Sequence, residues 1–464
     1  MNSPLRKAPT PVLASVLFTV ACAAWLPAQV RKAVNFSNLV VVGDSLAAGV
    51  ENGSLQHSQQ IHGFANVIAQ QIGTPLVLPL VPPPGAPNTL ELLNPGGFPP
   101  IIQPNPMPPL TFPAVRESPF QQATDVAVPL QTVADALTLK PSTSITPATG
   151  ETQLATDIVL GFPCPFVSLS CQPLTQVQQA VALHPTAIII DIGNNDILGA
   201  VTSGQLSTMV SSPSAFFAGF NKSYGSLMNA LAATRATLVV ANLPDVMEAP
   251  YFIPVWKLAQ AAQIPVFVVT RLLGLGPFDY VTLDALPAIE GILLDGAAGP
   301  LPLFCSATSP SIPCFVTFAQ GAQVRLVTIG LNAIIALQAL AHGAVVVDLF
   351  SLIDNLHTHG YKIGGTTLTT DFLGGLFSLD GLHPTNTGYA IMANQFIQTM
   401  NGAFRTAIPL ANVPQVAAKR SAAAVMLFLV RVPHACVYRL AEVPQANGRA
   451  PSIHPTISER LFRM

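Results

Sequence analysis

Five short runs of apolar, largely β-branched residues constrain the fold of this chain most strongly. They lie at residues 38–42, 76–81, 187–192, 236–241 and 343–350. A strand without polar alternation is buried on both faces, as in a parallel sheet that helices cover. Helix-like stretches lie between these runs or follow them, at residues 63–72, 126–137, 174–183, 213–233, 323–342 and 386–401. The alternation predicts an α/β fold with a doubly wound parallel sheet of five strands, in which active groups gather at the carboxyl ends of the strands.

The composition agrees with a large globular core and excludes several classes of protein. Of the 464 residues, 50% are hydrophobic and only 9% are charged, against about 25% charged in a typical soluble domain. Disordered chains have the opposite composition, so global disorder is excluded. The formal net charge of −2 gives no basic surface for a nucleic acid, and we expect no nucleic-acid partner.

The first 28 residues have the pattern of an export signal. Arg6 and Lys7 precede an uncharged apolar run at residues 11–25, and Ala24 and Ala28 offer small side chains for cleavage. The run is shorter than the stretch of about 20 residues that spans a membrane. We therefore expect residues 1–28 to be a signal peptide and the protein to be secreted or periplasmic. A buried N-terminal helix is the alternative.

The spacing of the cysteines agrees with export. Cys164 and Cys171 bracket one short loop, and Cys305 and Cys314 bracket another. Such pairs suit local disulfides in an oxidising compartment. We expect both pairs to be disulfides, and buried free thiols are the alternative.

Residues 29–416 are predicted to form one domain with two long, lid-like insertions. Residues 82–120 are dense in proline, and residues 248–315 contain short apolar runs, Trp256 and the second cysteine pair. Segments of this length are usually lids or binding surfaces, although surface packing or a linker accounts for them equally well.

Residues 417–464 hold seven basic and two acidic residues, a net charge of +5. We expect a basic, poorly ordered tail there; out-of-frame translation of downstream DNA is a second explanation.

Polar residues follow three of the expected strands, at the edge of the sheet where active groups gather. The sequences are GDSL at residues 43–46, GNND at residues 193–196 and DGLHP at residues 380–384. Each has an ordinary explanation when it is taken singly: a chance match, an Asx turn that caps the next helix, or a histidine in a surface loop. The occurrence of all three, each after a predicted strand, indicates a catalytic site.

The three motifs supply the groups of a serine hydrolase. The hydroxyl of Ser45, exposed at a strand-to-helix turn, is a weak nucleophile that needs a base. Asp380 and His383 are three residues apart, which can place the carboxylate beside imidazole Nδ1 and leave Nε2 free to accept a proton. The side-chain amide of Asn195 is a suitable donor to an oxyanion.

These motifs resemble blocks I, III and V of the SGNH hydrolase superfamily, the GDSL lipases and esterases, and the resemblance covers residues 38–404. It implies a flavodoxin-like, three-layer α/β/α sandwich. It also implies that Ser45 is the nucleophile and that His383 is the base, oriented by Asp380. Asn195 then contributes its amide to the oxyanion hole, together with the backbone N–H of Ser45. The resemblance implies no metal and no cofactor.

Block II is where the chain departs from the pattern of the family. The family has Asn-x-Ala-x-x-Gly, whereas this chain has DVAVPL at residues 125–130, so that Leu130 takes the place of the glycine. We expect the backbone N–H of Leu130 to complete the oxyanion hole provided that its φ angle is negative, because leucine does not easily adopt a positive φ. We also expect its side chain to crowd the acyl group and to favour small or slender acyl chains.

The sequence thus predicts an exported serine hydrolase that cleaves carboxylic esters, like a lipase or an esterase, through an acyl-enzyme. The alternatives are a non-catalytic exported binding module on the same fold, and an acyltransferase that passes the acyl group to an alcohol. The expected partner is a small-molecule or lipidic ester, with transient contact with a lipid interface. The sequence does not indicate the oligomeric state.

Overall fold

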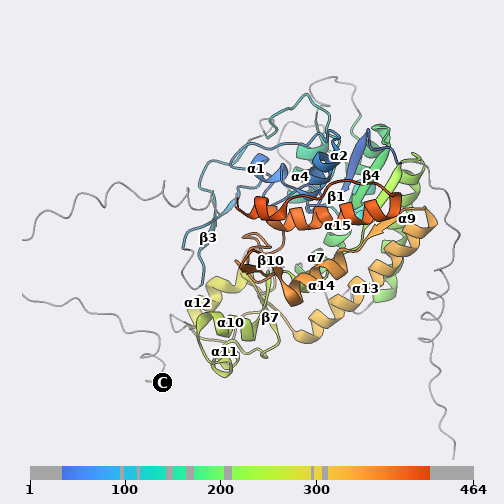
Figure 1. The fold of residues 1–464 in the computed structure, drawn as a ribbon. Coiled ribbons are helices and arrows are strands. Elements are labelled where there is room, and N and C mark those ends of the chain that lie inside the picture. The colour runs from blue at the N-terminus through green and yellow to red at the C-terminus, as the bar shows by residue number, and fades with distance from the viewer. Residues whose placement is uncertain are drawn as a thin grey trace, which may run out of the picture. The chain divides into compact units, whose positions relative to one another are not determined.

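Four parallel strands form the central sheet (Figure 1). They are β1 (Leu39–Gly43), β4 (Ala187–Asp191), β5 (Thr237–Ala241) and β9 (Val345–Val347), in the spatial order β1-β4-β5-β9. In the register of the sheet, Ala187 lies opposite Leu39 and Thr237, on its two sides. β1 and β4 are buried along their whole length, as expected for strands that are covered on both faces.

The computed structural model describes residues 34–94, 99–111, 115–142, 150–162, 172–202, 212–293, 297–305 and 312–418. All of the elements belong to one compact unit, Asn35–Met464. The predicted signal peptide, the Cys164 and Cys171 pair and the tail from residue 419 onward lie outside the described residues.

Residues 124–128 take the place of a fifth strand, and the prediction of a strand at residues 76–81 is wrong. On the free edge of β1, Val41 forms two backbone hydrogen bonds of 3.0 Å with residues 124–128. Pro79 interrupts the other segment, and because proline has no N–H it cannot continue the ladder of an inner strand. The sheet therefore has four regular strands rather than five, while the predicted α/β class is confirmed.

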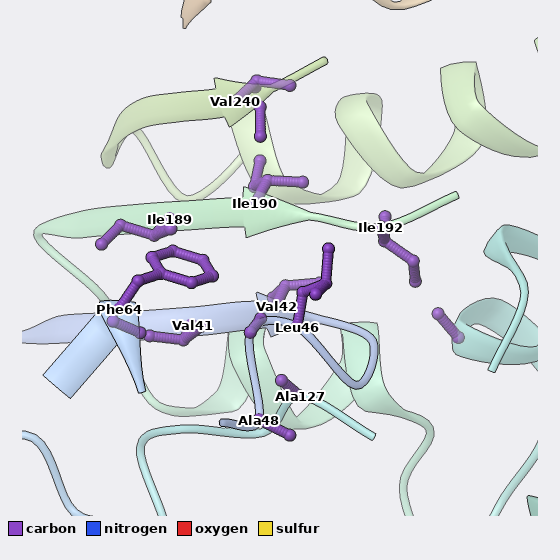
Figure 2. Packing of buried hydrophobic residues seen from close by; sticks show 14 of the residues in the cluster. Val41, Val42, Leu46, Ala48, Phe64, Ala127, Ile189, Ile190, Ile192 and Val240 are labelled. Carbon is purple, nitrogen blue, oxygen red and sulfur yellow. The ribbon is translucent and has the colours of Figure 1, made fainter. Parts of the chain in front are cut away.

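Helices cover the sheet on both faces and make it the middle of three layers. On one face α2 (Phe64–Ile72) packs against α15 (Asn386–Phe404). On the other, α9 (Pro213–Ala232) packs against α3 (Val133–Thr138), α6 (Gln176–Ala182) and α13 (Phe318–Ala341). Figure 2 shows the buried side chains at close range, with Phe64 of α2 beside Val41 of β1 and Ile189 of β4. The predicted three-layer α/β/α arrangement is confirmed.

Two predicted elements have different bounds in the structure. The helix predicted at residues 126–137 begins only with α3, after a capping box in which Thr132 and Asp135 satisfy each other's backbone N–H. The residues before it are the extended ones beside β1. The strand predicted at residues 343–350 ends with β9, because the carboxylate of Asp348 caps the next helix, α14 (Leu349–His359).

The insertion at residues 248–315 folds into a small α+β unit with a hydrophobic cluster of its own. It is entered through η2 (Val246–Glu248). Its elements are β6 (Phe252–Pro254), α10 (Val255–Ala262), α11 (Val266–Leu273), β7 (Tyr280–Thr282), η3 (Leu283–Ala285), α12 (Leu286–Leu293) and β8 (Phe315–Val316). β6, β7 and β8 form an antiparallel sheet. Leu258, Val269 and Ile289, one from each α-helix, are buried together, and a disulfide joins Cys305 to Cys314.

Short elements complete the described part of the chain. In the proline-rich insertion, β2 (Leu90–Leu92) pairs with β3 (Ile102–Pro104). The others are α1 (His57–Gln60), α4 (Glu151–Leu160), α7 (Asn194–Thr202) and the hairpin of β10 (Tyr361–Ile363) and β11 (Thr366–Leu368).

By length and composition alone, α13 is long and apolar enough to cross a membrane, and no other helix among the described residues is. A helix of a protein core has the same composition, and Val324, Leu331 and Ile335 of α13 are buried in the main hydrophobic cluster.

Candidate active site

The site lies at the carboxyl end of β1, where the chain turns sharply after Gly43. Asp44 and Ser45 follow in a turn rather than at the start of a helix, so the prediction of a strand-to-helix turn is wrong at this point. Gly43 is required there because a Cβ atom would lie 2.5 Å from the carbonyl oxygen of Asp191 on the neighbouring strand. The turn thus presents Ser45 at the edge of the sheet that the sequence indicated.

Asp44 ties this turn to the segment that follows β4. Its carboxylate accepts hydrogen bonds from the N–H of Leu46 at 3.2 Å and from the N–H and side-chain amide of Asn194 at 3.2 and 3.0 Å. Burial raises the pKa of Asp44 to about 6, against the lowering effect of these hydrogen bonds. Asp44 therefore fixes the position of Ser45 relative to the start of α7.

Asp380 and His383 form a pair within one tight loop. His383 Nδ1 lies 2.9 Å from Asp380 Oδ2, and Asp380 Oδ1 accepts the N–H groups of Leu382 and His383 at 2.8 Å each. The N–H of Gly53 also donates to Oδ2. Although burial raises it, the pKa of Asp380 is held below its ordinary value by the charge of His383 and by these hydrogen bonds. The carboxylate is thus ionised and lies against Nδ1 of the imidazole, and no hydrogen bond joins Nε2 to any residue that the structure describes.

Asn195 lies in the first turn of α7, next to the segment predicted as block II. Its side-chain amide donates to Gln131 O at 3.1 Å, and the carboxylate of the next residue, Asp196, accepts the N–H of Val133 at 3.0 Å. These contacts bring Asn195 and Leu130 to the same side of the site. Among the described residues, neither the N–H of Ser45 nor that of Leu130 donates to another protein group, so both are available to an oxyanion.

The conformation of Leu130 differs from the prediction. Its φ angle is +67°, the left-handed region in which glycine is at ease and a leucine is strained. Its side chain is 44% exposed and does not line the cavity that contains Ser45. The expectation of a negative φ is therefore wrong, and so is the expectation that the side chain crowds the acyl group.

We expect Leu130→Gly to stabilise the protein. If the φ angle of Leu130 were negative, the same substitution would destabilise it. A left-handed conformation costs a residue with a Cβ about 1–2 kcal/mol, and the extra freedom of unfolded glycine offsets about 0.5–1 kcal/mol of that. Urea unfolding should show a gain of about 0.5–1 kcal/mol. Leu373→Gly is the matched variant, because Leu373 also has a positive φ, of 61°. A loss of stability for Leu130→Gly would contradict the strained conformation.

A small apolar cavity opens at Ser45. Its volume is about 60 Å³, and its walls include Ser45, Asn195 and His383. The remaining walls are mainly hydrophobic and come from α7, η2, α14 and α15, with Leu198, Val246, Leu349, Ile353 and Met392 among them. These side chains were not found from the sequence, because no local motif marks them. Ser45, Asn195 and His383, which lie far apart in the chain, thus face one space.

No direct hydrogen bond joins Ser45 to His383 among the contacts of the described residues. Catalytic hydrogen bonds are often long in an empty site and shorten when substrate binds. Also within the described residues, no group of three His, Cys, Asp or Glu side chains is placed to hold a metal ion.

Three further carboxyl groups have raised pKa values; Asp125 and Asp191 are buried, and Asp196 is half-buried. Burial raises the pKa of Asp125 to about 8 and that of Asp196 to about 7, and it raises the pKa of Asp191 well above its ordinary value, with Asp44 adding to the effect. Asp125 accepts the N–H of Ala127 at 3.1 Å. These groups bind protons in the folded protein at pH values at which they are ionised in the unfolded chain.

We expect Asp125→Asn to remove part of the pH dependence of stability. The pKa of Asp125 is about 8 in the folded protein and about 4 in an unfolded chain. The folded state therefore holds the extra proton between these values, and the stability falls as the pH rises through them. From pH 5 to pH 8, urea unfolding should show Asp125→Asn gaining at least about 1–2 kcal/mol relative to wild type. Glu151→Gln, an exposed residue of α4, is the control. A difference that is the same at both pH values would contradict the prediction.

Comparison with known families gives the result that decides the assignment. The sequence profile of the family described as GDSL-like Lipase/Acylhydrolase matches residues 39–396. The chain belongs to this family. The resemblance inferred from GDSL, GNND and DGLHP is thereby confirmed, and membership of this family indicates a hydrolase that acts on esters.

Comparisons with individual proteins add little to the GDSL assignment. One solved structure, described as LAE5, an alpha/beta hydrolase enzyme from the metagenome of Lake Arreo, Spain, is 14% identical. The match covers 80% of this chain and 98% of that chain, with a TM-score of 0.33. Comparison with curated proteins finds no match.

Proposed function

We propose that this GDSL hydrolase cleaves carboxylic esters through a covalent acyl-enzyme on Ser45. The observation that carries the proposal is the pairing of His383 with Asp380 at 2.9 Å beside the cavity that Ser45 lines. His383 Nε2 accepts the proton of the Ser45 hydroxyl, whose oxygen attacks the ester carbonyl. His383 then donates the proton to the leaving alcohol, and water cleaves the acyl-enzyme with the same base. Asp380 keeps the proton of the imidazole on Nδ1 throughout.

The proposed oxyanion hole has three donors. They are the backbone N–H groups of Ser45 and Leu130 and the side-chain amide of Asn195. The absence of protein acceptors for the two backbone groups, within the described residues, supports this role. So does the contact of the Asn195 amide with Gln131, which holds it beside Leu130. Such preorganised donors stabilise the charge of the tetrahedral intermediate more strongly than they do the neutral ester.

The walls of the cavity support a substrate with a short, apolar acyl group. A volume of about 60 Å³ holds only a few methylene groups, and each methylene that is buried contributes about 0.8 kcal/mol.

We further propose that the protein is exported. The disulfide between Cys305 and Cys314 supports this, because such bonds persist in oxidising compartments.

A series of p-nitrophenyl esters with acyl chains from acetyl to dodecanoyl tests the proposal. The purified protein should hydrolyse the acetyl to butyryl esters best, and kcat/KM should fall about 10-fold or more by dodecanoyl, since the longer chain exceeds the cavity. Equal rates across the series would contradict the acyl assignment of the cavity. An absence of hydrolysis for every ester would contradict the proposed function.

A further inference from the structure

A second and larger cavity lies beside the one at Ser45. Its volume is about 750 Å³, within the range of about 300–1,000 Å³ that is typical of sites for small molecules. η2 lies between the two cavities, because Val246 lines the first and Met247 lines the second. The other walls of the second cavity come mainly from β6, α10 and β7 of the inserted unit, from α13 and α14, and from the loop at residues 370–373. The proposed ester hydrolysis makes no use of this space.

Aromatic rings form much of the wall of the second cavity. They belong to Phe252 of β6, Trp256 of α10, Tyr280 of β7, Phe318 of α13 and Phe372. Trp256 and Phe318 are 41% and 57% exposed, so a ligand can reach them from solvent. Large apolar side chains that gather at an exposed hollow mark a site of interaction. Aromatic rings also attract other rings through stacked and edge-to-face contacts, so this wall favours an apolar ligand that contains an aromatic ring.

On one side of the second cavity, the charged groups are bound to one another. Arg325 binds three carboxyl groups at once: Asp245 at 2.6 Å, Glu248 at 2.7 Å and Asp354 at 2.9 Å. Burial raises the pKa of Glu248 to about 7, and its carboxyl group shares a hydrogen bond with Asp354. The positive charge of Arg325 is therefore already neutralised by its neighbours.

The charged groups on the other side of the second cavity are paired as well. Lys257 forms an ion pair with Asp371 and lies over the ring of Trp256. His357 Nδ1 lies 2.9 Å from the hydroxyl oxygen of Thr370. A charged ligand would lose its hydration on entering and would have to compete for a counter-charge that is already bound. The wall therefore selects against cations and anions alike.

We propose that the second cavity binds a neutral, apolar molecule that contains an aromatic ring system. The rings of the ligand pack against Trp256 and Phe318, and its other apolar surface is buried against the remaining walls. A neutral ligand needs no counter-charge and gives up little hydration when it enters. A saturated ligand of the same size gains the burial of apolar surface but not the contacts between aromatic rings. The binding does not depend on the proposed ester hydrolysis.

Four probes that share one two-ring skeleton test the proposal by isothermal titration calorimetry on the full chain. They are naphthalenemethanol, naphthalenemethylammonium, naphthoate and decahydronaphthalenemethanol, all substituted at the same ring position. Naphthalenemethanol should bind about 10-fold tighter than either ion or better, and about 3-fold tighter than the saturated alcohol. An ion that binds as tightly as naphthalenemethanol, or no binding of naphthalenemethanol, would overturn the proposal. Equal affinities of the two alcohols would overturn the preference for an aromatic ring.

Two variants, each with its own control, locate the binding. Trp256→Ala should weaken the binding of naphthalenemethanol about 5-fold or more, and Phe267→Ala is its control, because Phe267 of α11 is exposed and does not line the cavity. Phe318→Ala should weaken the binding to a similar extent, and Leu340→Ala, an exposed position near the other end of α13, is its control. The second pair carries the test should Trp256→Ala not fold. Unchanged affinity in either folded cavity variant, or an equal loss in its control, would overturn the assignment of the site.

Discussion

Ser45→Ala is expected to lower kcat for the hydrolysis of short-chain esters by about 10⁴-fold or more. Without the hydroxyl no acyl-enzyme forms, and the remaining donors at Leu130 and Asn195 stabilise only a direct attack by water. The effect should fall on kcat, because the side chain of Ser45 contributes little to the binding of the ester. Steady-state kinetics on p-nitrophenyl acetate gives the measurement.

The matched control is Ser226→Ala, because Ser226 lies on the exposed side of α9 and its hydroxyl donates to Lys222 O in its own helix. It should leave kcat within about 2-fold of wild type. His383→Ala should lower kcat as far as Ser45→Ala does, and the double variant should lose little more, since the two groups act in one step. Wild-type turnover in Ser45→Ala would remove Ser45 from the mechanism.

Asp380→Asn has the second largest expected effect, a loss of about 10³–10⁴-fold in kcat. The carboxylate accepts the proton-bearing Nδ1 of His383 and three backbone N–H groups, including that of Gly53. An amide in its place presents N–H to at least one of these donors. It favours the wrong tautomer of His383 and leaves a buried donor unsatisfied, at a cost of about 1–3 kcal/mol in stability.

The loss of kcat and the loss of stability are separable for Asp380→Asn. Circular dichroism should show the variant folded at 25 °C, while p-nitrophenyl acetate turnover is reduced at every pH between 6 and 9. Glu151→Gln, the exposed control on α4, should change neither quantity. A folded Asp380→Asn variant with wild-type kcat would mean that His383 is oriented by another group.

Local sequence patterns were sufficient for the parts of the fold that continuous apolar runs specify. β1, β4 and β5 are buried on both faces, and their β-branched runs indicate that directly. Residues 76–81 form an equally apolar run that is no strand of the sheet, because Pro79 breaks it and residues 124–128 take the place beside β1. A continuous run of apolar residues indicates that the segment is buried, but it does not indicate whether the segment is a strand of the sheet.

For the candidate site, too, some features could be predicted from the sequence and others could not. Ser45, Asn195 and the pair of Asp380 and His383 follow strands or sit in tight turns, so short motifs marked them. The positive φ of Leu130 did not follow from the sequence, because Asp44, Asn195 and Gln131, which fix this corner of the site, are held by contacts between distant segments. The leucine side chain by itself favours a negative φ angle, but the contacts between distant segments hold Leu130 at a positive one.

The two cavities could not be predicted for a related reason. The walls of the first cavity come from elements that are spread along the chain, from the turn after β1 to α15, and those of the second come mainly from residues 245–373. The sequence marked residues 248–315 as an insertion that is a lid or binding surface, but it did not indicate three antiparallel strands with a separate hydrophobic cluster. That unit supplies Ala249, which lines both cavities, and Phe252, Trp256 and Tyr280 of the second cavity.

Labelling with a fluorophosphonate tests the central claim most directly, since the probe reacts covalently with an activated serine and needs no knowledge of the natural ester. We expect one adduct per chain by intact mass, located at Ser45 by peptide mapping. It should be absent in Ser45→Ala and His383→Ala, and it should form in parallel with the loss of esterase activity. An adduct on a different residue, or undiminished ester hydrolysis by fully labelled protein, would contradict the assignment of Ser45 as the nucleophile.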